Sequence, residues 1–211
     1  PPRVTPWYRV TSLPISAVSP MTSYTVTASH GCSSPVSITV DAAPTYTHYV
    51  YVANTDTSVS QYAVGTTGGL VALSPASATL GTSLPIPNQV AVTPDRKHAY
   101  VVDGGTNLVW QFAIGADGTL TALTPASVAT GGTPQQIAFD PASKFAYVIN
   151  KFDETIWLYT IGASGALTNV AAATIATGHG PVAVAVRPNG ASLYVVNLAD
   201  DTVSQYAIDG T

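Results

Sequence analysis

Short runs of alternating apolar and polar residues recur along most of the chain, and they predict β-strands throughout. In the segment 134–180 four such runs follow one another, at 135–140, 145–150, 155–161 and 167–177, and Gly, Pro or Asp residues separate them. No window keeps the 3.6-residue period of an amphipathic helix. The pattern therefore predicts an all-β fold built from short strands joined by tight turns.

The strand pattern is itself repeated. Tyr51, Tyr100, Tyr147 and Tyr194 open the phrases YVAN, YVVD, YVIN and YVVN, at spacings of 49, 47 and 47 residues, and prolines and aromatic residues keep the same interval. Four short strands in about 47 residues are typical of one blade of a β-propeller. A parallel β-helix would repeat at a shorter interval and fits less well.

The phase of the repeat predicts how many blades are present. The first YVAN phrase has no preceding proline-led strand, so the first blade should begin at its second strand. The last unit ends before its outer strand, which leaves about three and a half four-stranded blades, consistent with part of a seven-bladed ring. We expect the chain to continue, or a partner to complete the ring.

Residues 1–43 lie outside the repeat. Two alternating runs, 23–28 and 36–40, flank the turn at Gly31-Cys32 and predict a β-hairpin. The phrase resembles the end of a bacterial extracellular immunoglobulin-like β-sandwich. We therefore assign 1–43 to the C-terminal part of such a domain plus a linker, and 44–211 to a partial propeller. The chain has one cysteine, Cys32, which cannot form an internal disulfide and whose partner is open.

The segments 115–120, 132–140 and 145–150 resemble, in register, the YVTN or lactonase-like β-propeller family, which includes 6-phosphogluconolactonase-like proteins and surface-layer propellers. The resemblance implies a lactonase site with Arg and His beside the proline that opens each blade. The corresponding pairs in this sequence are Asn88-Gln89, Gln135-Gln136 and Val182-Ala183, which provide neither group. This departure argues against a lactonase site in these blades, and we assign no catalytic residue.

Candidate binding residues fall in the loops between second and third strands and in the connections between blades, which should share one face of the propeller. That face should be rich in Asn and Asp. The candidate ligand-binding set is His179, Asn150, Asp153, Glu154, Asn197, Asp200 and Asp201. The alternative is turn chemistry, because Asn and Asp suit tight loops for backbone reasons. No cofactor is expected; calcium is the one ion that such a face could hold, although no dense calcium-loop motif occurs.

Composition narrows the class of function. Hydrophobic residues make up 46% of the chain and charged residues only 9%, and the net charge of -4 excludes a basic nucleic-acid surface. No run is long and apolar enough to span a membrane. We expect an extracellular or cell-surface protein of bacterial type. The favoured function is non-enzymatic surface assembly, adhesion or binding, with other subunits or a surface polymer or glycan as partners. The alternative is a lactonase-like hydrolase whose site lies mainly in blades outside this sequence.

Overall fold

A computed structural model describes residues 23–28, 36–41, 48–81 and 86–209. These residues form β-strands, turns and bends, and among them no helix is long and apolar enough to cross a membrane. The chain divides into two compact units, Pro1–Thr45 and Tyr46–Thr211. The prediction of an all-β fold is confirmed.

In the first unit, β1 (Ser23–Ala28) pairs antiparallel with β2 (Val36–Asp41), and Val26 lies opposite Ile38. The two predicted strands therefore form a hairpin. The turn and Cys32 lie outside the described residues.

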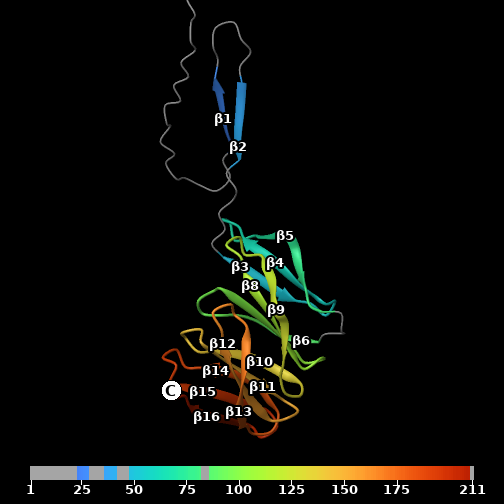
Figure 1. The fold of residues 1–211 in the computed structure, drawn as a ribbon, viewed down its shortest axis with the longest axis vertical. Helices are drawn as coiled ribbons and strands as arrows, with labels where there is room; N and C mark the ends of the chain where they lie inside the picture. The colour runs from blue at the N-terminus through green and yellow to red at the C-terminus, as the bar shows by residue number, and fades with distance from the viewer. Residues whose placement is uncertain (1–22, 29–35, 42–47, 82–85, 210–211) are drawn as a thin grey trace, which may run out of the picture. The chain divides into compact units, whose positions relative to one another are not determined.

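The second unit consists of consecutive antiparallel sheets (Figure 1), four in all within the described residues. Two sheets have four strands in sequence order, which is the predicted arrangement of a complete blade. Blade two contains β6 (Pro87–Val92), β7 (His98–Asp103), β8 (Leu108–Ile114) and β9 (Leu120–Ala129). Blade three contains β10 (Pro134–Phe139), β11 (Phe145–Asn150), β12 (Thr155–Ile161) and β13 (Leu167–Ala176).

The two flanking sheets have three strands each. Blade one contains β3 (Tyr49–Ala53), β4 (Ser58–Val64) and β5 (Leu70–Thr79), so within the described residues it begins at its second strand, as predicted. Blade four contains β14 (Pro181–Val186), β15 (Ser192–Asn197) and β16 (Thr202–Ala207), without an outer strand among the described residues. The inner strand β10 lies beside both β6 and β14, so successive blades stack side by side.

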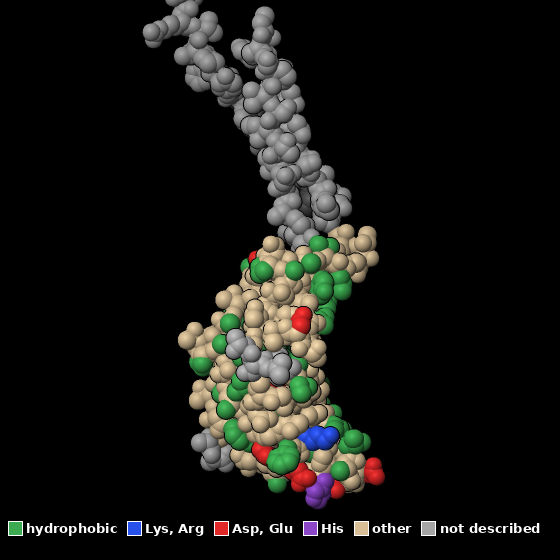
Figure 2. All heavy atoms as spheres, turned by 90° about the vertical axis from the view of Figure 1, so that its right-hand side faces the viewer, with side chains coloured by type: hydrophobic (Ala, Val, Ile, Leu, Met, Phe, Trp, Pro, Cys, Tyr) green, Lys and Arg blue, Asp and Glu red, His purple; other side chains and the backbone are tan. Residues whose placement is uncertain are grey.

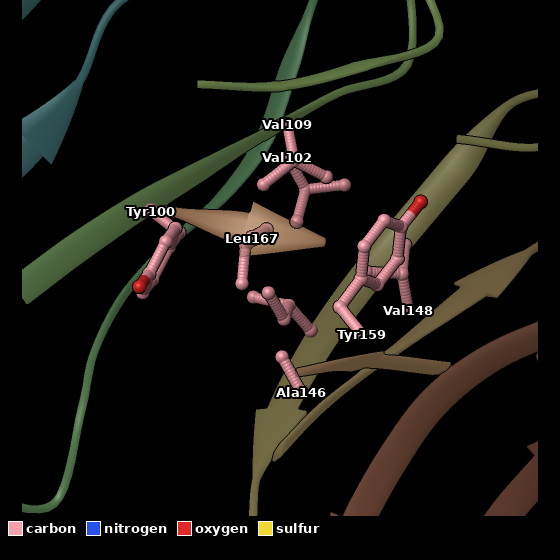
Figure 3. Packing of buried hydrophobic residues seen from close by; sticks show 8 residues of the cluster. Tyr100, Val102, Val109, Ala146, Val148, Tyr159 and Leu167 are labelled. Carbon is pink, nitrogen blue, oxygen red and sulfur yellow. The ribbon is translucent and has the colours of Figure 1, made fainter. Parts of the chain in front are cut away.

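The core lies between blades. Because side chains alternate across a strand, β11 sends Ala146 and Val148 into one apolar cluster and Tyr147 and Ile149 into the next. Figure 3 shows the first of these clusters, where Leu167 packs among side chains from blades two and three. The YVIN phrase is therefore apolar on both faces because both faces are covered by neighbouring blades.

Candidate functional site

The loops after the second strands and the connections between blades meet at one end of the sheets. In blade three, the Asp153 carboxylate accepts a hydrogen bond from the Gly132 N–H at 2.6 Å. One repeat later, the Asp200 carboxylate accepts the same bond from the His179 N–H at 2.7 Å. Each carboxylate thus fixes the connection that leads into its own blade. The repeated contact also explains why an acid recurs at this loop position.

His179 adds a side chain to this repeated contact, because the position that is glycine in blade three is histidine in blade four. Its Nδ1 lies 2.9 and 3.0 Å from the two carboxylate oxygens of Asp200, and its Nε2 lies 3.8 Å from Glu154 Oε2. The imidazole is 69% exposed. In Figure 2, acidic side chains gather near a histidine at the lower edge of the view. The result is a solvent-facing His–Asp pair with a second carboxylate close by.

His179 and Asp200 each shift the pKa of the other. The hydrogen bond to Asp200, followed by the charges of Asp200 and Glu154, raises the pKa of His179 above its ordinary value of 6.5. The backbone N–H of His179 and then its imidazole lower the pKa of Asp200 below 3.8. Both partners are therefore charged at pH values that lie between the pKa of Asp200 and the pKa of His179. The ion pair is lost when the pH rises through the pKa of His179 or falls through that of Asp200.

A shallow hollow surrounds the pair. Side chains and backbone from both blades line it: Thr133, Lys151, Phe152, Glu154, His179, Gly180, Ala199 and Asp200. Phe152 is 82% exposed and presents an apolar ring, and Lys151 is the one lysine or arginine among the lining residues. Lys151 and Phe152 were not singled out from the sequence, although they fall in the same loop as Asp153 and Glu154.

The other predicted site residues are placed differently. Asn150 and Asn197 are fully buried. Asn150 accepts a hydrogen bond from the Thr130 hydroxyl, whereas the Asn197 amide donates to Thr202 and Ser204, and its Oδ1 has no partner among the described residues. Neither side chain lines the hollow. Asp153 and Asp201 are exposed but also lie outside its lining.

Backbone geometry explains much of the polar loop composition. Thr57, Asn107, Glu154 and Asp201 occupy corresponding positions in the four blades, and all have positive φ values, from 53° to 71°. The chain therefore needs a left-handed turn residue at this position whatever the blade binds, and Asn and Asp tolerate that conformation best. Turn chemistry therefore accounts for Asn107 and Asp201, whereas Thr57 and Glu154 adopt the same conformation without that preference.

Asp103, which corresponds to Asn150 in the repeat, is a buried acid. Its carboxylate accepts hydrogen bonds from the Ile86 and Gly105 N–H groups, the Trp110 indole and the Thr106 hydroxyl. Burial alone would raise the pKa of Asp103, but these hydrogen bonds outweigh it and lower the pKa below its ordinary value. The Asp103 carboxylate therefore stabilises the loop of blade two, and its hydrogen bonds to the protein leave it unavailable to a ligand.

The positions where the family resemblance implies Arg and His have a structural role. The Gln89 amide oxygen accepts the Ile137 N–H of blade three at 2.7 Å, and the Gln136 amide oxygen accepts the Val184 N–H of blade four at 2.6 Å. Each glutamine follows a β-bulge at the start of its inner strand, which turns its side chain toward the next blade. These amides join blades and have no acid–base function.

No metal centre is evident in the parts of the chain that the structure describes, since no three His, Cys, Asp or Glu side chains come together there as ligands. The pair at His179 is thus the candidate site that the described blades present, with Glu154, Lys151 and Phe152 around it.

Comparison with known proteins identifies the fold family. The family described as lactonase, 7-bladed beta-propeller, matches residues 5–211. A 6-phosphogluconolactonase candidate from Bacteroides fragilis NCTC 9343 is 27% identical with a TM-score of 0.62, and the match covers 73% of this chain and 48% of that one. No curated protein matches significantly.

Two further structures share the fold. The periplasmic gluconolactonase of Pseudomonas aeruginosa is 21% identical, with a TM-score of 0.64 over 76% of this chain and 50% of that one. A Lactobacillus plantarum protein is 19% identical, with a TM-score of 0.65 over 83% and 58%. This chain therefore spans about half the length of these structures. With its four consecutive sheets and this match across nearly the whole sequence, the chain belongs to the lactonase family of seven-bladed β-propellers.

Proposed function

We propose that these blades are part of a lactone hydrolase, and that the His179–Asp200 pair is their contribution to its chemistry. The observation that carries the proposal is the exposed imidazole held on a carboxylate at 2.9 Å, on the loop face of a lactonase-family propeller. The similarity to a 6-phosphogluconolactonase candidate supports the same class of reaction. The remaining blades of the ring would complete the site.

The proposed mechanism is general-base hydrolysis. With its proton on Nδ1 and bonded to Asp200, the neutral imidazole of His179 leaves Nε2 as an acceptor toward the hollow. Nε2 takes a proton from water as the water oxygen bonds to the lactone carbonyl carbon. The ring C–O bond of the tetrahedral intermediate then breaks, the leaving alkoxide takes the proton back from Nε2 of the imidazolium, and the product is a hydroxy acid. Asp200 orients the ring and stabilises the imidazolium, as the carboxylate of a catalytic triad does.

The surrounding side chains fit this substrate class. Phe152 offers an apolar wall beside the base, and Lys151 offers a cation to a carboxylate or phosphate on the substrate. Because Asp200 and Glu154 raise the pKa of His179, the base form accumulates only as the pH rises above 6.5. Turnover should therefore increase with pH through that raised pKa.

The experiment is a hydrolysis assay of the full-length protein with gluconolactone and 6-phosphogluconolactone. We expect His179→Ala to lower kcat/KM by about 100-fold or more, the typical contribution of a general base. Asp200→Asn should lower the rate and move the pH profile to lower pH. Lys144→Ala, an exposed change at the other end of β11, is the matched control and should leave turnover within about twofold. Full activity in His179→Ala would reject the role of this pair.

A second proposal is a non-enzymatic propeller for surface assembly, adhesion or glycan binding, in contact with other subunits or a surface polymer. It is favoured by Gln89 and Gln136, which occupy the positions expected to carry Arg and His and use their amides to join blades. Absence of lactone turnover in the full-length protein, together with saturable glycan binding or retention at the cell surface, would favour this function over hydrolysis.

An extracellular location and an immunoglobulin-like domain ending in the β1–β2 hairpin belong to the same proposal. The alternating pattern of both strands supports the domain assignment, whereas the family match that begins at residue 5 favours a propeller origin for this segment. Expression of the natural gene with its upstream sequence, followed by cell fractionation, would test both points. Cytoplasmic retention of the intact protein would reject the location.

A further inference from the structure

One asparagine of the chain is followed by glycine. In chain order the seven asparagines are succeeded by Thr, Gln, Leu, Lys, Val, Gly and Leu, and the glycine case is Asn189-Gly190. This pair lies in the turn between β14 and β15, at the opposite end of β14 from His179, and Asn189 is exposed. Because glycine has no Cβ, no side chain of its own shields the Gly190 backbone nitrogen.

The same turn is open to solvent in the other blades. The positions that correspond to Asn189 in the repeat are Asp95 of blade two and Ala142 of blade three, and both are exposed. Blade three is exposed there although its inner strand lies beside those of blades two and four. The exposure of Asn189 therefore comes from the position of the turn at the end of a blade, and neighbouring blades do not remove it.

Hydrogen bonds within the turn make the side-chain amide of Asn189 an electrophile. Its Oδ1 accepts the Ala191 N–H at 3.1 Å, and this donor would stabilise the negative charge that develops on the oxygen when a nucleophile adds to Cγ. The Gly190 nitrogen can reach Cγ by closing a five-membered ring, with the advantage of an intramolecular reaction. Its N–H donates to the Arg187 carbonyl at 2.8 Å, so the nitrogen becomes available when this exposed turn opens.

We propose that Asn189 is a site of spontaneous deamidation, with water as the co-reactant. The Gly190 nitrogen loses its proton and bonds to Cγ of Asn189. The bond from Cγ to Nδ2 breaks, and Nδ2 takes up a proton and leaves as ammonia. Water then opens the five-membered imide at one of its two carbonyl carbons. Opening at Cγ gives aspartate, whereas opening at the main-chain carbon gives isoaspartate, in which the backbone runs through Cβ and Cγ.

The two products affect blade four differently. Aspartate preserves the backbone and the acceptor for the Ala191 N–H, and it adds a negative charge two residues from Arg187. Isoaspartate lengthens the main chain by one methylene group next to Gly190. This glycine has a positive φ of 76°, and a Cβ added to it would lie 3.3 Å from Cδ of Pro141 in blade three. We therefore expect isoaspartate to displace the turn from Pro141 and to weaken the packing of blade four on blade three.

The test incubates the folded full-length protein at mildly alkaline pH and follows the peptide that contains residue 189 by mass spectrometry. We expect ammonia release and a mass increase equal to the replacement of NH2 by OH, at a rate proportional to the hydroxide concentration. Chromatography should separate the aspartate and isoaspartate forms. Asn88, which is also exposed but precedes Gln89, is the internal control and should stay unchanged. Asn189→Gln, which would require a six-membered ring, should show no conversion over the same period.

Thermal melts of the aged protein test the consequence for blade four. The melting temperature should fall as isoaspartate accumulates, whereas Asn189→Gln aged in the same way should keep its melting temperature. Conversion of Asn88 as fast as Asn189 would overturn the proposal, and so would conversion of Asn189 in urea alone, because the folded turn would then protect the nitrogen. An equal fall in melting temperature for the aged variant would overturn the effect on blade four.

Discussion

Truncation of one leucine tests the idea that the stability of this chain resides between its blades. Leu70, Leu120 and Leu167 hold the same position in three successive blades. Leu120 and Leu167 are 7% and 5% exposed because a preceding blade covers them, whereas Leu70 is 54% exposed in the described structure. The chain therefore provides one substitution, Leu to Ala, in matched backbone settings with very different burial.

We expect Leu167→Ala to lower the free energy of unfolding by about 3 to 5 kcal/mol, the range for a buried leucine whose surroundings cannot collapse into the cavity. Leu120→Ala should cost about the same. Leu70→Ala should cost less than about 0.5 kcal/mol, because little apolar surface leaves water there on folding. For a domain of this size, about 1 kcal/mol shifts the melting temperature by about 2 to 4 °C. Leu167→Ala should therefore lower it by about 6 to 20 °C.

The measurement is urea and thermal unfolding of the 211-residue chain, followed by circular dichroism near 218 nm and by tryptophan fluorescence. Coincident transitions from the two probes would justify a single free energy for each variant. The argument fails if Leu70→Ala costs as much as Leu167→Ala, or if Leu167→Ala costs less than about 1 kcal/mol.

Three further changes test other parts of the structure. Gly165→Ala should be far more destabilising than Gly68→Ala in thermal melts. Both glycines have positive φ, so the backbone strain is similar at the two positions. An added Cβ at Gly165 would overlap a histidine ring of the preceding blade, whereas at Gly68 it would meet nothing within 4 Å. Comparable losses would contradict this difference. Gln136→Leu should cost about 1 to 3 kcal/mol in urea unfolding, because it leaves a backbone N–H of the next blade without its acceptor; an unchanged midpoint would contradict it. NMR titration should place the pKa of His179 above 6.5, and Asp200→Asn should lower it toward that value. A normal pKa in the unmodified chain would argue against the pair in solution.

The repeat was predictable because it depends on local chemistry. The alternation around Tyr147, the prolines that open β10 and β14 and the glycine turns each specify a short strand, and three copies reinforce the register. The phase of the first blade followed from the same pattern, because the first YVAN phrase has no preceding proline-led strand. The local pattern of residues 46–211 is therefore enough to predict the blades.

The site was less predictable because it depends on contacts across the repeat. His179 and Asp200 lie 21 residues apart, and only the folded loops bring the imidazole onto the carboxylate. The pair formed by Gly132 and Asp153 has the same separation, so the periodicity contained a signal for this contact. The roles of Gln89 and Gln136 had no such signal, because a β-bulge decides where their amides point.

The glutamine contacts between blades also set a delay between the synthesis of a blade and its docking to the next. Gln61, Gln89, Gln111 and Gln136 each accept a hydrogen bond from a backbone N–H that is 48 to 59 residues closer to the C-terminus. At about 5 to 20 residues per second, a ribosome needs roughly 2 to 12 s to deliver each partner. Until then the amide oxygens of Gln61 and Gln111, which are fully buried in the folded chain, have only water as a hydrogen-bond donor. During synthesis the contacts between neighbouring blades therefore become available one after another, in the order in which the blades leave the ribosome.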